Sequence, residues 1–313
     1  MPSLRRRQGG TAAEDVKLQI QENVQKIHAQ YPFLPFMAGG FFLGGLVVYL
    51  SLTSLSGNRQ TVASAAVTPR SLRLDQQDDG WHQIHVFYGD KKGLGEDPKK
   101  ASYAQCNQDR VILDLIGESG FFIDLAANDA LELTNTLVLE RYPGWNGLCI
   151  EPNPGYWYGL SHRKCTVVGA LMADKVEQVE VKFRGVYGGI VGKMNDKLAN
   201  FKKEPDTNQE KRYTANLQSV LERFQVPKTI DYLSLDIEGA EFMVMQHFPF
   251  DKYNIKVMTV ERPKKNLKQL FEEKGFIHLK DLTWWGETLW AHKSTGLTPD
   301  HPKVQKIKTE EKN

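Results

Sequence analysis

Residues 121–126, FFIDLA, form a short apolar run that predicts a buried strand. Similar runs occur at 147–151 (GLCIE), 165–170 (CTVVGA), 230–236 (IDYLSLD) and 255–261 (IKVMTVE). Segments with helical spacing lie before and between these runs, and we expect helices at 102–116, 129–142, 154–162, 217–224, 240–246 and 266–274. Strands that alternate with helices in this way build a mostly parallel sheet with helices on both faces.

Two more strands are predicted at 276–282 and 288–292, with no helix between them, so they form an antiparallel hairpin. The alternating segment 178–184 (QVEVKFR) predicts an edge or accessory strand, and the polar insertion 202–211 predicts a surface loop. A mostly parallel sheet that ends in a hairpin is the layout of the α/β class I methyltransferase fold, which is Rossmann-like.

Composition narrows the class of protein. The 313 residues include 40 Lys and Arg and 38 Asp and Glu, a net charge of +2, so nucleic acid is not an expected partner. The charged share of 25% and the hydrophobic share of 41% exclude a mostly disordered chain. The chain has three cysteines, Cys106, Cys149 and Cys165. Rough strand register puts Cys149 and Cys165 too far apart for a bridge, so buried free thiols are expected.

The N-terminal part carries a membrane signal. No Asp, Glu, Lys or Arg occurs from Ile27 to Asn58, and the apolar stretch 31–55 is long enough to cross a hydrocarbon core of about 30 Å as one helix. A buried core helix and a cleaved signal peptide are the alternatives. Basic residues before the stretch favour a type II anchor with the C-terminal part outside the cytoplasm, namely Arg5, Arg6, Arg7, Lys17 and Lys26.

The predicted organisation is therefore a basic, amphipathic tail (1–30), a transmembrane anchor (31–55), a linker (56–80), a main domain (81–293) and a frayed polar tail (294–313). Gly40 and Gly44 form a GxxxG motif that would let two anchors pair as a homodimer. We expect an endomembrane location, in the endoplasmic reticulum or Golgi, with the main domain in the lumen. The chain has no Asn-x-Ser/Thr sequon, which disfavours the lumen, so another organelle membrane stays open.

The residues that follow the carboxyl end of a strand form its exit, and two of these strand exits have the chemistry of a nucleoside site. Residues 124–130 (DLAANDA) form a turn of small residues that lets backbone amides approach a ligand. Glu151 ends the next strand, where an acidic side chain suits the two hydroxyls of a ribose. This pair predicts an adenosine-containing cofactor, and it does not separate a nicotinamide dinucleotide from S-adenosylmethionine.

A third exit is acidic. Asp236 and Glu238 follow one strand, and Glu261 ends the next, so three carboxylates are expected to gather at one edge. Such a group can hold a divalent cation or supply a general base with a raised pKa. The alternative is that Glu238 or Glu241 only favours the positive start of the following helix.

These blocks also occur together in one family. FIDLAAND (122–129), GLCIEPNP (147–154), VPKTIDYLSLDIEGAE (226–241) and TVERP (259–263) resemble the FkbM-type methyltransferases, especially their eukaryotic membrane-anchored branch. The upstream Gln108-Asp109 pair and the late GETLWAH (286–292) fit the same pattern. The resemblance covers residues from about 100 to 292, in the same order and spacing.

The resemblance implies O-methylation that depends on S-adenosylmethionine. It implies that Asp124, Ala126 and Asn128 line the methionine part of the cofactor. It further implies that Glu151 takes the ribose hydroxyls and that Asn153 flanks the adenosine pocket. A hydroxyl of a glycan or of another small molecule is the expected acceptor.

For catalysis we expect Asp236 to act as base or metal ligand, with Glu238 as its partner and Glu261 nearby. The chain departs from the family pattern where Ala126 and Ala130 replace glycines of the first turn, because a methyl group restricts positive φ. Weakened cofactor binding would leave a catalytically inactive trafficking or interaction module as the alternative function. A glycosyltransferase is a third hypothesis. A type II topology is typical of these enzymes, and Asp236-Ile237-Glu238 resembles an acidic metal motif for nucleotide sugars.

Overall fold

The computed structural model describes residues 84–89, 95–184, 187–191 and 209–312, which all belong to the compact unit Arg73–Asn313. The predicted tail, anchor and linker, with Gly40 and Gly44, lie outside the described residues. Within the described ranges, every helix is too short or too polar to cross a bilayer.

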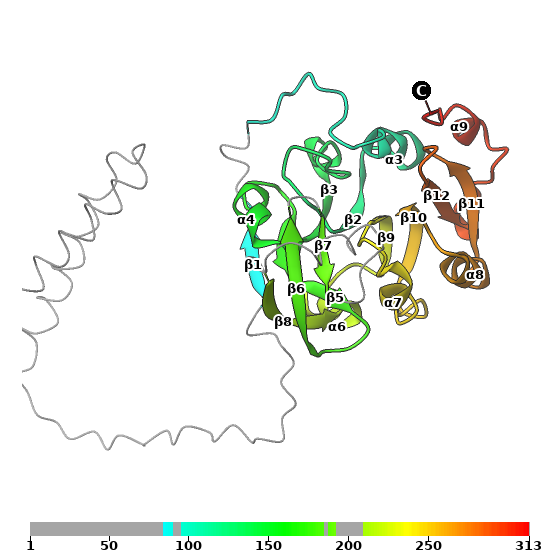
Figure 1. Cartoon of the computed structure of the whole chain (residues 1–313). Helices are drawn as coiled ribbons and strands as arrows, with labels where there is room; N and C mark the ends of the chain where they lie inside the picture. The colour runs from blue at the N-terminus through cyan, green and yellow to red at the C-terminus, as the bar shows by residue number, and fades with distance from the viewer. Residues whose placement is uncertain (1–83, 90–94, 185–186, 192–208, 313) are drawn as a thin grey trace, which may run out of the picture. The chain divides into compact units, whose positions relative to one another are not determined.

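Eight strands of the described part form one mixed sheet (Figure 1). In spatial order they are β1 (His85–Tyr88), β4 (Thr166–Gly169), β3 (Gly144–Ile150), β2 (Ser119–Leu125), β9 (Thr229–Leu235), β10 (Asn254–Glu261), β12 (Glu287–His292) and β11 (Phe276–Asp281). The five strands from β4 to β10 are parallel, and the predicted hairpin of β11 and β12 is confirmed, with β12 antiparallel to β10. This α/β arrangement is consistent with the predicted class I layout.

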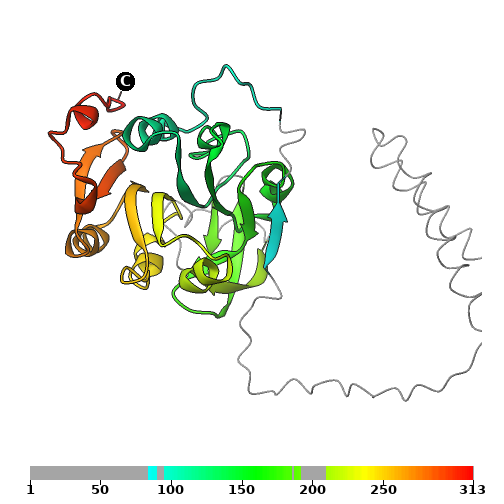
Figure 2. The same ribbon diagram turned by 180° about the vertical axis from the view of Figure 1, so that it is seen from behind.

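Helices cover both faces of this sheet (Figures 1 and 2). They are α3 (Gln108–Ile116), α4 (Pro154–Leu160), α6 (Leu217–Arg223), α7 (Glu241–Met245), α8 (Lys265–Glu273) and α9 (Pro302–Gln305), with the 3-10 turns η2 (Leu139–Arg141) and η4 (Lys293–Thr295). Ile123 and Leu125 of β2 pack in the core that α6, α7 and α8 cover. Phe122 packs in the core on the other face, with α3 and α4. The alternation along β2 thus sorts its side chains between two cores.

A smaller sheet lies beside the cavity described below. Its order is β5 (Leu171–Ala173), β8 (Gln209–Asn216), β6 (Gln178–Arg184) and β7 (Tyr187–Ile190). The accessory strand predicted at 178–184 is confirmed as β6, which pairs with both β7 and β8. Of the insertion expected as a loop, residues 209–211 begin β8, and 202–208 lie outside the described residues.

The helix predicted at 129–142 is wrong. Only η2 is helical there, because local polar groups compete with the helix. Asp129 Oδ1 accepts hydrogen bonds from the amides of Leu131 (2.8 Å) and Glu132 (3.0 Å). Leu133 then takes a positive φ of 55°, which ends any right-handed turn.

The frayed C-terminal tail is also a wrong prediction. Leu297 and Val304 are buried, so the segment has an apolar side that packs on the domain. The amide of Glu310 donates to the carbonyl of Leu282 (2.8 Å), and the amide of Trp284 donates to the carbonyl of Glu310 (3.0 Å). The residues up to Glu310 therefore belong to the domain.

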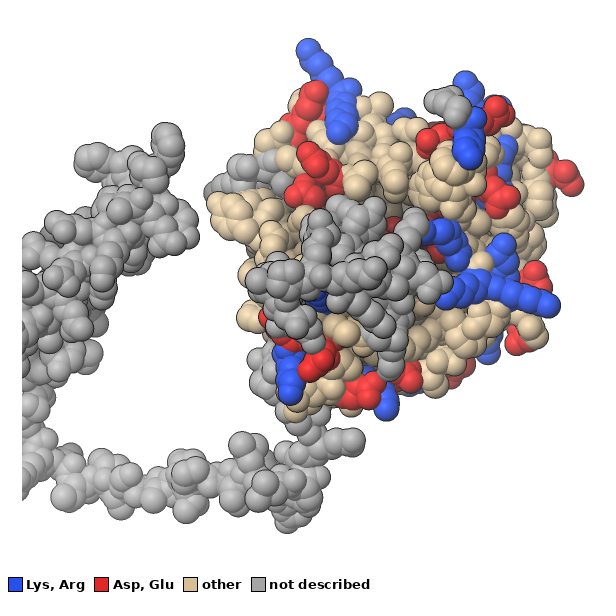
Figure 3. Space-filling view, in the orientation of Figure 1, with Lys and Arg blue, Asp and Glu red and all other residues tan. Residues whose placement is uncertain are grey.

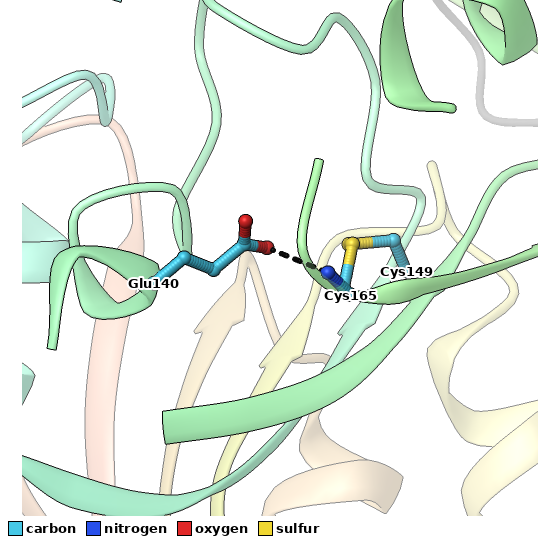
Figure 4. A group of neighbouring side chains, drawn as sticks. All are labelled: Glu140, Cys149 and Cys165. Carbon is cyan, nitrogen blue, oxygen red and sulfur yellow. Dashed lines mark hydrogen bonds between the residues drawn. A yellow bond between two sulfur atoms is a disulfide. The ribbon is translucent and has the colours of Figure 1, made fainter. Parts of the chain in front are cut away.

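The two buried thiols expected to be free form a disulfide instead (Figure 4). Cys149 lies in β3, and Cys165 stands directly before β4. Because β3 and β4 are parallel neighbours with Leu148 opposite Thr166, the Cα atoms of the two cysteines lie 6.0 Å apart. Cys106 is the free cysteine of the described residues.

A buried ion pair stands beside this bridge. Arg163, fully buried, binds Glu140 through Nη2 (2.8 Å) and Nε (3.2 Å). Its other contacts are the hydroxyls of Thr134 (2.7 Å) and Thr136 (2.9 Å). Glu140 also accepts from the amide of Cys165 (3.3 Å), the bond drawn in Figure 4. Each charge is thus paired and hydrogen-bonded, which a buried ion pair requires.

Removing the disulfide is expected to destabilise the domain. The bridge closes a loop with a sequence separation of 16, and a loop of this size is worth roughly 2–4 kcal/mol. We expect the double variant Cys149→Ala/Cys165→Ala to lower the free energy of unfolding by about this amount in urea titrations. Cys106→Ala is the matched control and should leave the bridge intact. Three thiols that all react with maleimide in the unreduced, unfolded parent chain would contradict the disulfide.

Candidate functional site

A cavity of about 370 Å³ lies at the carboxyl ends of β2, β3 and β9. Its polar wall comes from the strand exits and includes Asn128, Glu151, Asn153, Asp236 and Glu238. Its apolar wall comes from the smaller sheet, which supplies Leu171, Met172, Phe183 and Ile190, and from α7, which supplies Met243. Acidic and basic side chains are interspersed over the described surface of the face drawn in Figure 3.

The register of the central strands brings the exits together. Leu125 of β2 stands opposite Ile150 of β3 on one side and Leu235 of β9 on the other. The next residue of each strand therefore leaves the sheet at the same level. Those residues are Ala126, Glu151 and Asp236, and all three line the cavity.

Glu151 joins the first two exits. Its Oε2 accepts a hydrogen bond from the amide of Asn128 (2.8 Å), and its Oε1 accepts one from the amide of Asn153 (2.7 Å). The residue is 4% exposed, and burial raises its pKa to about 7 although both amide bonds favour the charged form. A carboxylate fixed in this way has lone pairs left for a ligand hydroxyl.

The first turn forms without its glycine. Ala126 takes a φ of 65°, and its amide donates to the carbonyl of Ile150 (2.9 Å). The left-handed conformation costs an alanine roughly 1–2 kcal/mol, which the surrounding contacts offset. Asn128, with a φ of 58°, has a buried Oδ1 that finds no hydrogen-bond partner among the described residues. The turn therefore keeps its shape and offers one acceptor to a ligand.

Asp124 faces away from this cavity. It is buried on the opposite face of β2, where the hydroxyl of Thr136 donates to its Oδ2 (2.6 Å). Burial raises the pKa of Asp124, while Thr136 and the nearby Arg163 act against the rise. The structure thus brings Ala126, Asn128, Glu151 and Asn153 together at the cavity and places Asp124 in the polar network behind the turn.

The three predicted carboxylates meet at the third exit. Oxygen atoms of Asp236, Glu238 and Glu261 all lie within 4.8 Å of one another. Burial raises the pKa of Asp236 well above its usual range, and the negative charges of Glu261 and Glu238 add to the rise. Its buried Oδ1 accepts no hydrogen bond from the part of the chain that the structure describes.

A positive charge already stands in this acidic group. Arg262 follows Glu261 with a φ of 43°, and its Nη2 binds the Glu261 carboxylate and lies 3.9 Å from Oε2 of Glu238. Its buried Nε has no hydrogen-bond partner within the described ranges. A divalent cation at the three carboxylates would therefore compete with the guanidinium.

Glu287 is a fourth acid at this edge that the exits alone did not indicate. It pairs with Glu261 across β10 and β12 and is 3% exposed. Burial raises its pKa to about 8, while hydrogen bonds to Gln108 and Thr259 act against the rise. The sequence signal for this acid lies in the GETLWAH block, which contains Glu287, and in the Gln108-Asp109 pair, which contains its hydrogen-bond partner.

Glu241 has a structural role. Its Oε1 accepts hydrogen bonds from the amides of Ile237 (3.2 Å) and Gly239 (2.9 Å) at the start of α7. The alternative interpretation, that this side chain serves the helix start, therefore fits Glu241. It does not fit Glu238, which lines the cavity with a φ of 53°.

Comparisons with known proteins identify the family of this domain. Among solved structures, a precorrin-6y C5,15-methyltransferase from Geobacter metallireducens GS-15 is similar at 12% identity and a TM-score of 0.32, over 66% of this chain and 98% of that chain. The search of curated proteins found no match. Residues 124–279, which include all three exits, match the methyltransferase FkbM domain. The resemblance of the strand exits is thereby confirmed, and the chain belongs, through this domain, to the FkbM methyltransferases.

Proposed function

We propose that this chain is an O-methyltransferase that binds S-adenosylmethionine in the cavity at the strand exits. The observation that carries the proposal is Glu151, a buried carboxylate fixed between two exits at the end of the second strand of the parallel series. An acid at this position of a doubly wound sheet suits the paired hydroxyls of a ribose.

The other residues of the cavity fit the same cofactor. Oδ1 of Asn128, which is unpaired among the described residues, can accept a hydrogen bond from the ammonium group of the methionine part. Leu171 and Met172 offer an apolar wall for the adenine, and the volume of about 370 Å³ lies in the range of small-molecule sites. When bound, S-adenosylmethionine supplies a methyl group on a sulfonium centre.

The acidic exit supports transfer to a hydroxyl. We propose that Asp236, whose pKa burial and neighbouring acids raise, takes the proton of the acceptor hydroxyl. Glu238 and Glu261 can hold further hydroxyls, which favours a glycan or another polyhydroxylated small molecule as the acceptor. A divalent cation at these carboxylates stays a prediction, and the presence of Arg262 favours the base over the metal ligand.

We further propose that the chain belongs to the eukaryotic membrane-anchored branch, with the domain in the lumen of the endomembrane system. The Cys149–Cys165 disulfide supports this location, because disulfides persist in oxidising compartments and are rare in the cytosol. The apolar stretch 31–55 supplies the anchor, and pairing through Gly40 and Gly44 stays a prediction. In sealed microsomes, the domain of the full-length chain should resist added protease until detergent is present. Digestion without detergent would contradict the luminal location.

Calorimetric titration of the full-length chain with S-adenosylmethionine tests the cofactor proposal. We expect the parent to bind and Glu151→Gln to bind about 10- to 100-fold more weakly, because a hydrogen bond to a charged group is worth about 1.5–3 kcal/mol. Glu118→Gln is the matched control, since Glu118 is exposed at the amino end of the same sheet. If the folded parent does not bind S-adenosylmethionine, the enzyme proposal is wrong, and a catalytically inactive trafficking or interaction module becomes the better-supported function.

The pH dependence of binding gives an independent check on Glu151. Its pKa of about 7 means that the carboxylate is mostly charged at pH 8 and mostly protonated at pH 6. The charged form accepts the ligand hydroxyls, so lowering the pH should raise the Kd for S-adenosylhomocysteine by about tenfold over this interval. The same titration with Glu151→Gln should show a much flatter profile, although Asp236 and Glu287 titrate in both proteins. If the Kd of the parent and that of Glu151→Gln changed equally with pH, the pH dependence would belong to a group other than Glu151.

A further inference from the structure

Arg212 connects the smaller sheet to the loop that carries Glu151. It lies on β8 with a side chain 17% exposed, and its Nη1 donates a hydrogen bond to the carbonyl of Pro152 (2.7 Å). Its Nη2 forms an ion pair with Oε1 of Glu210 (2.8 Å), which holds the guanidinium from its own strand. The contact joins residues 60 positions apart in the sequence.

Two aromatic rings flank the guanidinium. Its central carbon lies 5.3 Å from the ring centroid of Trp157 and 5.6 Å from that of Phe183, distances at which cation–π attraction acts. Trp157 lies in α4 and packs against His85 of β1, with ring centroids 4.6 Å apart, so it stands on the side of the larger sheet. Phe183 belongs to β6 and lines the cavity. Arg212 therefore fills the junction between the two sheets.

The loop itself is held at successive carbonyl groups. Nε1 of Trp157 donates to the carbonyl of Glu151 (2.8 Å), and Arg212 donates to the next carbonyl, that of Pro152. The Glu151 carboxylate in turn accepts the amides of Asn128 and Asn153. A shift of Pro152 would therefore move the carboxylate that joins both exits.

We infer that Arg212 is a positioning residue for the cofactor, acting through Pro152 to hold Glu151 in place, an inference that rests on the proposed function. The planar guanidinium donates to Pro152 and Glu210, and the rings of Trp157 and Phe183 lie 5.3 and 5.6 Å from its central carbon. A lysine ammonium carries the charge and can replace one hydrogen bond, but it lacks that plane. The residue touches neither the cofactor nor the acceptor in this scheme.

The test compares Arg212→Ala and Arg212→Lys with Lys211→Ala in the full-length chain. Lys211 precedes Arg212 on β8, so its exposed side chain points to the opposite face, and its variant is the matched control. Two quantities are measured at one pH: the Kd for S-adenosylhomocysteine by calorimetry, and the hydrogen-exchange rates of the Asn128 and Asn153 amides in the ligand-free protein. The urea midpoint of each variant reports global stability.

We expect Arg212→Ala to raise the Kd about tenfold or more and to speed exchange at both amides selectively, since it removes a donor from a partly buried carbonyl. Arg212→Lys should fall between Ala and the parent, and Lys211→Ala should match the parent. A residue that only stabilises the fold would lower the urea midpoint and speed exchange of all core amides alike, without a change in Kd.

Unchanged Kd and unchanged exchange at Asn128 and Asn153 in Arg212→Ala would overturn the inference. If the parent itself does not bind S-adenosylhomocysteine, the proposed function fails separately. The exchange of the two amides then decides by itself whether Arg212 positions the loop.

Discussion

The candidate site depends on the parallel pairing of β2 with β3 on one side and β9 on the other. In a parallel sheet the carboxyl ends of neighbouring strands meet at one edge, and here Leu125, Ile150 and Leu235 stand level with one another. Glu151 can reach the amide of Asn128 only because of this register. A slip of one residue in β3 would turn Glu151 to the other face of the sheet and would break the link between the exits.

Support for the first exit comes from the opposite face of the sheet. Asp124 alternates with Leu125, so it points away from the cavity and binds Thr136, which in turn binds Arg163. Arg163 is paired with Glu140, and the disulfide lies beside this pair. The network explains why 129–142 stays largely non-helical: Thr134 and Thr136 direct their hydroxyls at a buried guanidinium. Loss of one partner of such a pair leaves an uncompensated buried charge, at a cost of about 3–5 kcal/mol.

Electrostatics divides the cavity into two parts. At one end the buried Glu151 carboxylate accepts hydrogen bonds from two amides, and burial raises its pKa to about 7. At the other end, the carboxyl groups of Asp236, Glu238, Glu261 and Glu287 lie near Arg262. Burial raises the pKa of Asp236 and of Glu287, and repulsion between the acids adds to the rise. Under the proposed function, the first end holds the ribose hydroxyls of the cofactor and the second takes the proton of the acceptor hydroxyl.

Local sequence patterns predicted the five central parallel strands, the accessory strand β6, the hairpin and the composition of the exits. These features are local: apolar runs, small-residue turns and acids that end strands carry their signal within a few residues. The motif blocks also led to Glu151 and to the acidic group around Asp236.

The Cys149–Cys165 bridge, the direction of Asp124, the packing of the C-terminal segment and the contact of Arg212 with Pro152 follow from tertiary packing alone. Each of these depends on which strands become neighbours and in which register. Neighbouring strands are set by burial summed over the whole sheet, and residues 60 positions apart meet without any pattern in the sequence between them. Local pattern therefore gave the parts of the site, and strand pairing gave their geometry.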